Sequence, residues 1–234
     1  MLEFKSFASG SSGNMYTLTD GKTKIMIEAG IKIRDIKKAL DFKVSSVSGV
    51  LLSHIHKDHS RSIKDLVKLG VDCYMPHSTA QEIGVNHHRV KTIEADKQFK
   101  IGTFTILPFN AEHDVETFGY LIVNQQGKKL LFLTDSYYCR YKFKGLNIIA
   151  IEANYSMKIL EEKIANGSLP EVMKTRLMRS HFSLENVKDF LRANDLSKVE
   201  EIWLLHLSDT NSDAEQFKRE IAEQTGKMIY VPSK

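Results

Sequence analysis

The sequence predicts an α/β protein in which helices lie outside two packed β-sheets, an arrangement written αβ/βα. Along its 234 residues, short strand patterns alternate with helical patterns. No glycine-rich dinucleotide fingerprint follows any predicted strand, which argues against a doubly wound sheet. No stretch rich in proline, glycine and serine divides the chain, so we expect a single domain spanning residues 1–234.

The N-terminal elements follow from residue alternation and turn signals. Asp20-Gly21 separates two alternating runs and is typical of a β-hairpin turn. The apolar run Val50-Leu51-Leu52 indicates a strand buried on both faces. The predicted elements here are strands at 2–8, 15–19, 24–28 and 47–53 and a short helix at 33–40.

The rest of the chain alternates between strands and helices and becomes mostly helical toward its end. Ser60 is expected to cap a helix with apolar residues at helical spacing, which we assign to the core: Ile63, Leu66, Val67 and Leu69. The further predicted strands are residues 71–75, 90–94, 99–108, 119–123, 129–133, 147–152, 201–205 and 227–231. The further predicted helices are a short one ending at 83 and those at 157–165, 171–179, 184–193 and 213–225.

Four potential metal ligands lie within six residues directly after the strand at 47–53. They belong to the segment Ser53-His54-Ile55-His56-Lys57-Asp58-His59. Side chains two apart in an extended chain share a face, so His54 and His56 point the same way, whereas Asp58 and His59 fall where the strand must end. Neutral imidazoles suit Zn²⁺ or related metals, and a carboxylate beside them can bridge to a second ion. A solvated loop that carries these residues by accident is the alternative.

Other acidic and imidazole residues also stand just past the ends of apolar strands. Taken alone, each such histidine is more often a structural residue with satisfied hydrogen bonds. Strand ends on one rim of a sheet bring distant residues together, so their recurrence predicts a single site. The residues at strand ends are His54, His56, His113, Asp135 and His206.

The segment Ser9-Gly10-Ser11-Ser12-Gly13-Asn14 ends the first predicted strand, residues 2–8. Its residues tolerate unusual backbone dihedrals and donate hydrogen bonds. A plain turn explains them equally well. The functional interpretation is a loop whose groups, including Ser11, Ser12 and Asn14, hold a phosphate oxygen of the substrate.

Composition excludes some classes of protein and weakly favours an anionic ligand. The net charge of +4 and pI near 8.9 suit a phosphate-bearing substrate but fall short of the basic stripe of a dedicated nucleic-acid binder. No apolar run approaches the roughly 20 residues that span a bilayer, and the start carries no signal-peptide pattern. We therefore expect a cytoplasmic protein without a membrane partner, in which Cys73 and Cys139 are free thiols.

The H-x-H-x-D-H pattern of residues 54–59 resembles the signature of the metallo-β-lactamase superfamily. This resemblance implies a four-layer αβ/βα sandwich of two mixed sheets flanked by helices, with two divalent metal ions, Zn²⁺ or Mn²⁺. It also implies that Asp135 bridges the ions and that Asp58 orients the nucleophilic water. The implied ligands are His54, His56 and His113 on one ion and Asp58, His59 and His206 on the other.

Further motifs make the resemblance more specific. His181, in Ser180-His181-Phe182-Ser183, resembles the loop histidine of tRNA-maturing phosphodiesterases, which protonates or stabilises the leaving oxygen. A histidine that merely lies near a helix N-cap is the alternative. Six motifs resemble the YycJ-like branch, which contains 5′→3′ DNA exonucleases and is similar to phage anti-Pycsar phosphodiesterases. These motifs are Gly10–Asn14, His113-Asp114 with Phe118-Gly119-Tyr120, Leu133–Asp135, Glu152–Tyr155, His181–Asn186 and His206–Ser208.

The anti-Pycsar enzymes open cyclic pyrimidine mononucleotides and are homodimers, so the resemblance implies a small nucleotide substrate, a homodimer and, for a phage protein, the host cytoplasm. Two departures bear on substrate preference. Glu28 stands where the superfamily commonly has Asp, and could still orient a motif histidine. Asn154-Tyr155 replaces the usual Asn-His, and Asn154 is a predicted substrate contact.

Three functions are therefore considered. The first is a dinuclear-metal phosphodiesterase acting on cyclic mononucleotides such as cyclic CMP and cyclic UMP, which counters host antiviral signalling. The second is the same chemistry on DNA or RNA ends, suggested by the run Arg140-Tyr141-Lys142-Phe143-Lys144, which alternates cations with aromatics. A solvated strand edge is the alternative explanation of this run. The third is a non-catalytic module that sequesters nucleotides, which the predicted leaving-group acid His181 argues against.

Overall fold

The computed structural model divides into two units, and each is built around β-strands. The model describes residues 1–232. Unit 1 comprises residues 1–110 and 115–128, and unit 2 comprises residues 111–114 and 129–232. That the two units form the single domain expected from the sequence stays a prediction.

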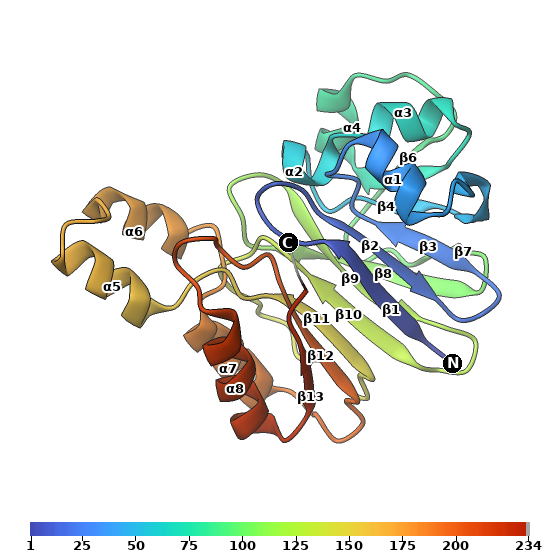
Figure 1. Cartoon of the computed structure of the whole chain (residues 1–234). Helices are drawn as coiled ribbons and strands as arrows, with labels where there is room; N and C mark the ends of the chain where they lie inside the picture. Colours follow the sequence, from blue (N-terminus) through green and yellow to red (C-terminus); the bar gives the residue numbers. More distant parts are fainter. Residues whose placement is uncertain (233–234) are drawn as a thin grey trace. The chain divides into compact units, whose positions relative to one another are not determined.

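Unit 1 contains a six-stranded mixed sheet in the order β1-β2-β3-β4-β5-β6 (Figure 1). The first two pairings are antiparallel, whereas β3-β4, β4-β5 and β5-β6 are parallel. Parallel neighbours need crossover connections, which here run through short helices. The strands are β1 (Glu3–Ala8), β2 (Met15–Thr19), β3 (Lys24–Ile27), β4 (Val50–Leu51), β5 (Cys73–Pro76) and β6 (Val90–Ile93).

Apolar helix faces pack against this sheet and form the core of unit 1. Ile36, Ile63, Leu66 and Val67 are buried together with sheet residues that include Met26. The first three of the sequence-predicted core positions after residue 60 are thus confirmed, but Leu69 is 45% exposed because the helix ends before it. The helices are α1 (Ile33–Ala39), α2 (Lys57–Ser60), α3 (Ile63–Lys68) and α4 (His77–Ile83).

Two local expectations need correction. The strand expected at 47–53 is only two residues long, because only Val50 and Leu51 pair with the neighbouring strands β3 and β5. The strand expected at 99–108 is a hairpin of β7 (Phe99–Ile101) and β8 (Phe104–Ala111), since Gly102 adopts a left-handed φ of 55° between them. The strand β9 (Thr117–Val123) follows β8 in the sheet order β9-β8-β7.

Unit 2 is built on four parallel strands in the order β13-β12-β11-β10. Parallel strands are covered on both faces, and accordingly every residue of β11 is buried. The strands are β10 (Lys129–Leu133), β11 (Ile148–Glu152), β12 (Glu201–Leu205) and β13 (Met228–Tyr230).

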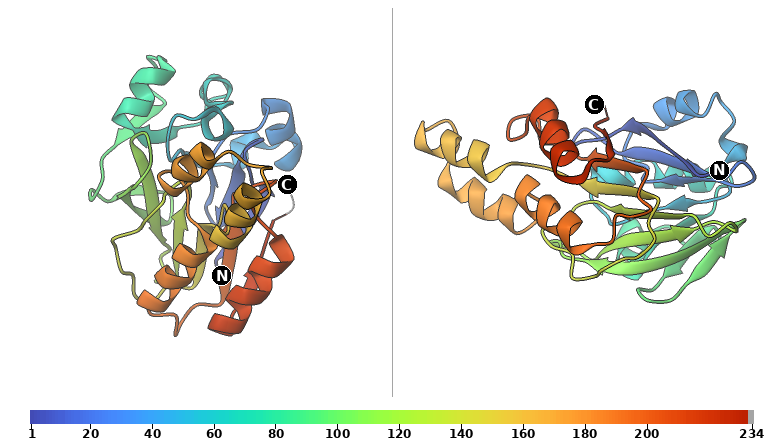
Figure 2. Two further views of the ribbon diagram at one scale, coloured as in Figure 1. Left: turned by 90° about the vertical axis from the view of Figure 1, so that its left-hand side faces the viewer. Right: turned by 90° about the horizontal axis from the view of Figure 1, so that it is seen from below.

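The helices of unit 2 differ in how much they bury. The helices α7 (Leu184–Ala193) and α8 (Ala214–Thr225) begin at side-chain caps, Ser183 and Asp213, and bury apolar faces. The helices α5 (Met157–Ala165) and α6 (Glu171–Met178) extend away from the strands of their unit (Figures 1 and 2). No helix among residues 1–232 is both long enough and apolar enough to cross a membrane.

Candidate metal centre

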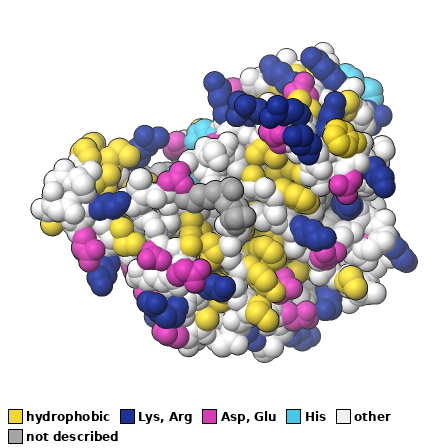
Figure 3. All heavy atoms as spheres, in the orientation of Figure 1, with side chains coloured by type: hydrophobic (Ala, Val, Ile, Leu, Met, Phe, Trp, Pro, Cys, Tyr) yellow, Lys and Arg dark blue, Asp and Glu magenta, His cyan; other side chains and the backbone are white. Residues whose placement is uncertain are grey.

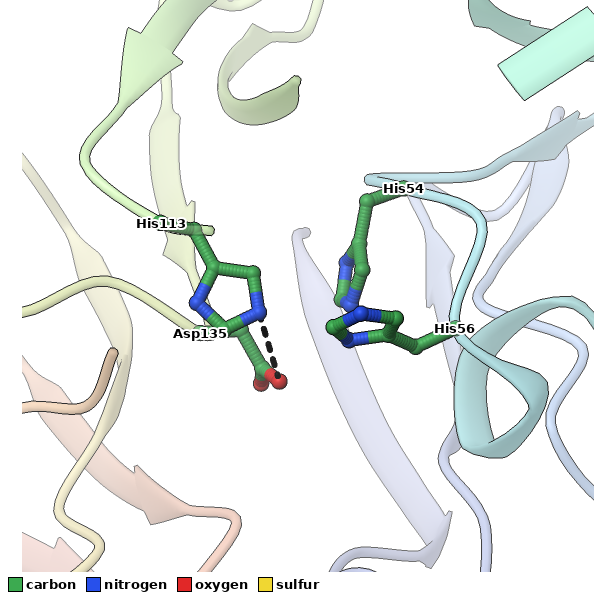
Figure 4. Close-up of side chains that lie close together, drawn as sticks. All are labelled: His54, His56, His113 and Asp135. Atoms are coloured by element: carbon green, nitrogen blue, oxygen red, sulfur yellow. Dashed lines mark ion pairs between the residues drawn. The ribbon is translucent and has the colours of Figure 1, made fainter. Parts of the chain in front are cut away.

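The predicted ligands of unit 1 lie in one group directly after β4. The ring centroids of His54 and His56 are 4.6 Å apart in an edge-to-face arrangement (Figure 4). The ring of His59 lies 4.3 Å from that of His54, and its Nε2 lies 3.5 Å from Oδ2 of Asp58. The short helix α2 produces this grouping, because it turns the chain back immediately after His56. We call these four residues the unit-1 group.

Polar side chains hold two of these imidazoles at the nitrogen nearer the backbone. Nδ1 of His54 lies 2.8 Å from Oγ of Ser53, and Nδ1 of His59 lies 3.4 Å from Oε2 of Glu28. Glu28 is completely buried and also accepts a hydrogen bond from the Ser53 backbone. Such partners fix the orientation of a ligand imidazole. The longer carboxylate at position 28 therefore contacts a motif histidine, as the sequence predicts.

A second group lies within unit 2, at the carboxyl ends of its parallel strands. Asp135, Glu152, His181 and His206 each offer a ligand atom, and these atoms all lie within 4.8 Å of one another. We call these four residues the unit-2 cluster. His113 approaches it from the segment after β8, with Nε2 3.8 Å from Oδ2 of Asp135, the ion pair dashed in Figure 4. Nε2 of His206 lies 3.9 Å from Oδ1 of Asp135.

The imidazoles of unit 2 are also held at Nδ1. Nδ1 of His113 lies 2.8 Å from the Ser180 carbonyl oxygen, and Nδ1 of His206 lies 3.4 Å from Oε1 of Glu152. Their Nε2 atoms are therefore the ones that face Asp135. Imidazole nitrogens oriented in this way beside a carboxylate form the donor set of Zn²⁺ and related divalent ions. The residues present thus fit such a metal.

Glu152 is a site residue that was not predicted among the acidic and imidazole residues at strand ends. It ends β11, is completely buried, and its Oε1 lies 2.6 Å from Nδ1 of His181. Its Oε2 accepts hydrogen bonds of 3.1 Å from the backbone N–H groups of Ser136 and Phe182. The sequence carried the signal, because Glu152 is the last residue of an apolar strand, and Asp135 and His206 lie just past the ends of theirs.

The backbone is strained where the strands deliver these side chains. Glu28, Asp135 and His206 have φ values of 63°, 47° and 51°. Left-handed conformations cost a non-glycine residue about 1–3 kcal/mol and gather at functional sites. Each of the three lies immediately beyond its strand or one residue later, at the ends of β3, β10 and β12.

Electrostatics give the histidines of unit 2 different protonation preferences. Burial alone lowers the pKa of His181, but the charge of Glu152 and their hydrogen bond outweigh it, so the pKa is raised. Burial also lowers the pKa of His113, and the attraction of Asp135 and Asp114 does not reverse this. Burial favours the neutral form of the Glu152 carboxyl. The charge of His181 and its hydrogen bond to the carboxylate outweigh this effect, so the pKa of Glu152 lies below its usual value. His181 thus favours the imidazolium, whereas His113 favours the neutral form that metals bind.

The predicted substrate contacts are placed unequally. Ser11 and Ser12 are exposed, whereas Asn14 is buried and donates to the Asp58 carbonyl oxygen at 3.1 Å. The side chain of Asn154 donates to the His206 carbonyl oxygen at 2.9 Å. Both amides therefore contact the candidate metal ligands, and a role for any of the four in substrate binding stays a prediction.

Comparison with known proteins places these observations in a family. Residues 23–206 match the model of the beta-lactamase superfamily domain. Exodeoxyribonuclease WalJ of Streptococcus pneumoniae is 27% identical over 227 residues, covering 90% of this chain and 83% of the relative. Exodeoxyribonuclease YycJ of Bacillus anthracis is 24% identical over 240 residues, covering 95% and 88%.

A solved structure shares the fold. The metallo-beta-lactamase fold protein YhfI of Bacillus subtilis superposes with a TM-score of 0.73 at 14% identity, over 100% of this chain and 97% of that protein. The α/β fold of two mixed sheets flanked by helices, expected from the sequence, is confirmed.

Proposed function

Because the chain belongs to the beta-lactamase superfamily, we propose that it is a metal-dependent phosphodiester hydrolase. The observation that carries the proposal is the contact between Nδ1 of His181 and Oε1 of Glu152, 2.6 Å, inside a cluster that also contains Asp135 and His206. A metal-binding set combined with a protonated imidazole suits a reaction whose alkoxide leaving group needs a proton. The relatives WalJ and YycJ are both named exodeoxyribonucleases, and these names support hydrolysis of a phosphodiester bond.

The proposed site takes two divalent cations, Zn²⁺ or Mn²⁺. Bound together, such cations supply a hydroxide near neutral pH and neutralise phosphoryl oxygens. Asp135 would be a ligand of both cations. The remaining ligands are His54, His56 and His113 for one cation and Asp58, His59 and His206 for the other.

The chain's own groups perform the remaining steps. Glu152 keeps His181 protonated, so that the imidazolium can donate its Nε2 proton to the departing oxygen. Asp58, 24% exposed at its side chain, orients the attacking water. Asn14 and Asn154 hold the backbone around the ligands, and Ser11 and Ser12 are exposed and available to a phosphate oxygen.

The proposed substrate is a cyclic mononucleotide such as cyclic CMP or cyclic UMP. The modest net charge of +4 and the absence of an inserted nucleic-acid clamp between His113 and His181 support a small ligand. The resemblance to anti-Pycsar phosphodiesterases supports a role against host antiviral signalling in the host cytoplasm. It also supports a homodimer, and α6, which buries no residue and leaves Val172 72% exposed, offers a face for it.

A 5′→3′ DNA exonuclease is the second candidate. Residues 32–68 contain nine Lys and Arg and four Asp. Their net charge is therefore more positive than the +4 of the whole chain. Figure 3 shows Lys and Arg side chains gathered over the region of α1 and its neighbouring helices in unit 1. Such a surface attracts a polyanion, and the two exodeoxyribonuclease relatives span most of the chain.

Metal-loaded protein incubated separately with cyclic CMP, cyclic UMP, cyclic AMP and 5′-labelled single-stranded DNA tests the proposal. Ring opening with intact DNA supports the first candidate, and release of nucleotides from DNA alone supports the second. His54→Ala should abolish either activity, whereas His87→Ala, which changes an exposed loop histidine, should not. Tight binding without turnover of any substrate would contradict the hydrolase.

A further inference from the structure

We propose that a cavity of about 230 Å³ in unit 2 is a subsite for the nucleobase of the substrate. The inference rests on the proposed function and adds to it, because it names the part of the substrate that the protein recognises. The cavity lies between the loop after β10 and the helix α7, and all its lining residues belong to unit 2.

Both walls of this cavity are tied to the same carboxylate oxygen. The loop wall, Tyr138–Lys142, is tied to Ser136, whose hydroxyl donates to the Tyr138 carbonyl oxygen at 2.7 Å. The helix wall includes Phe182, directly after His181. The backbone N–H groups of Ser136 and Phe182 donate to Oε2 of Glu152 at 3.1 Å each. A base in the cavity therefore keeps its sugar and phosphate next to the unit-2 cluster.

The lining offers ring faces and amide groups together. Tyr138, 56% exposed, and the half-buried Tyr141 supply aromatic surface, whereas the rings of Phe182 and Phe190 in the lining are buried. Bases stack on such side chains, and their edges are read by hydrogen bonds. The amide nitrogen of Asn186 donates to the Tyr137 carbonyl oxygen at 3.1 Å, while its oxygen accepts no hydrogen bond from the described residues 1–232. That oxygen can accept from an exocyclic amino group of a base.

Charge and size also favour a single nucleotide. Lys142 is exposed and forms no ion pair with any described residue, whereas the neighbouring Arg140 is paired with Glu112. The Lys142 ammonium is thus available to a phosphate. A cavity of about 230 Å³ is smaller than the roughly 300–1,000 Å³ of drug-sized ligand pockets. It therefore suits one planar ring system, from a cyclic mononucleotide or from the terminal nucleotide of DNA.

Paired substrates that differ only in the base test the inference. For metal-loaded protein, kcat/KM is measured on cyclic CMP and on ribose 3′,5′-cyclic phosphate with a methyl group in place of the base. The DNA arm uses strands whose 5′ nucleotide is normal or abasic. In Tyr138→Ala the ratio of base-bearing to baseless kcat/KM should fall roughly 5- to 150-fold, since stacking of one base contributes roughly 1–3 kcal/mol. Tyr138→Phe keeps the ring and should restore the ratio.

Binding separates the subsite from the proposed function. If wild-type protein hydrolyses the substrates and the ratio does not change in Tyr138→Ala, the subsite is wrong and the hydrolase stands. If the wild-type protein hydrolyses none of the substrates, the proposed hydrolase function is wrong. Calorimetric titration with CMP and with ribose 5-phosphate then tests the subsite by itself. Tighter binding of CMP that Tyr138→Ala removes supports it, and equal affinity for the two ligands overturns it. Lys142→Gln should weaken the binding of both ligands. Lys144→Gln changes a lysine outside the cavity lining and should leave both affinities unchanged.

Discussion

Nδ1 of His181 lies 2.6 Å from Oε1 of Glu152, a carboxylate with no exposed surface. The same oxygen lies 3.4 Å from Nδ1 of His206. One buried charge thus contacts both the proposed leaving-group acid and a proposed metal ligand. Replacing His181 should therefore affect proton donation and leave metal binding unchanged.

His181→Ala should reduce kcat on a nucleotide substrate by roughly 10²–10⁴-fold, the usual contribution of a general acid. The loss should be much smaller on bis(4-nitrophenyl) phosphate, because 4-nitrophenolate departs without a proton. Metal content, measured by elemental analysis, should stay at the wild-type value. Loss of metal from this variant would mean that His181 is a ligand rather than an acid.

Glu152→Gln should shift the pH dependence of kcat. The charge of Glu152 raises the pKa of His181, so the wild-type acid stays protonated to a higher pH than an ordinary histidine. Without that charge the pKa falls, and the alkaline decline in kcat should begin at lower pH. A pH profile of kcat checks this, and an alkaline limb that does not move would show that the observed ionisation belongs to another group.

Glu28→Gln should weaken metal binding about 10–100-fold, the typical effect of losing the partner of a ligand histidine. Glu28 contacts Nδ1 of His59 at 3.4 Å and is completely buried. Competition with a chelator measures the affinity. Glu82→Gln changes an exposed glutamate of unit 1 and is the matched control. Equal affinities in the two variants would contradict the role of Glu28.

Gly30→Ala should destabilise the protein by about 1–3 kcal/mol or more, as overpacking does. A Cβ at Gly30 would lie 1.6 Å from the Asp58 carbonyl oxygen and 2.8 Å from the Asn14 backbone nitrogen. Gly127→Ala is the control, since Gly127 has a φ of 76° but nothing within 4 Å of the added atom. The free energy of unfolding, measured in urea, should be lower for Gly30→Ala than for Gly127→Ala. The reverse order would refute the steric argument.

The two cysteines should react slowly in the folded protein. Burial raises the pKa of Cys73 to about 12 and that of Cys139 to about 11, so almost no thiolate exists at pH 8. Both are free thiols, as the sequence predicts. Mass spectrometry after iodoacetamide treatment should find two labels only after denaturation. Rapid labelling of the native protein would show that these environments open readily.

The sequence alone determined the fold class and the strand-end positions of the proposed ligands. Local signals suffice there, because strand alternation, helical spacing and the H-x-H-x-D-H spacing depend on neighbours along the chain. The predicted helix at 184–193 and the strand at 201–205 have the same bounds in the structure. Free thiols and the contact of Glu28 with a motif histidine were also predictable.

Only the tertiary structure decided which side chains meet. The sequence marks Glu152 as the end of an apolar strand, but its contacts with His181 and His206 join segments 29 and 54 residues away. The hairpin at Gly102, the exposure of Leu69 and the cavity beside Phe182 likewise depend on what packs nearby. Distant contacts carry no local signal, because they arise when parallel strands align their carboxyl ends, and the strained backbone at Asp135 and His206 persists only in that packed state.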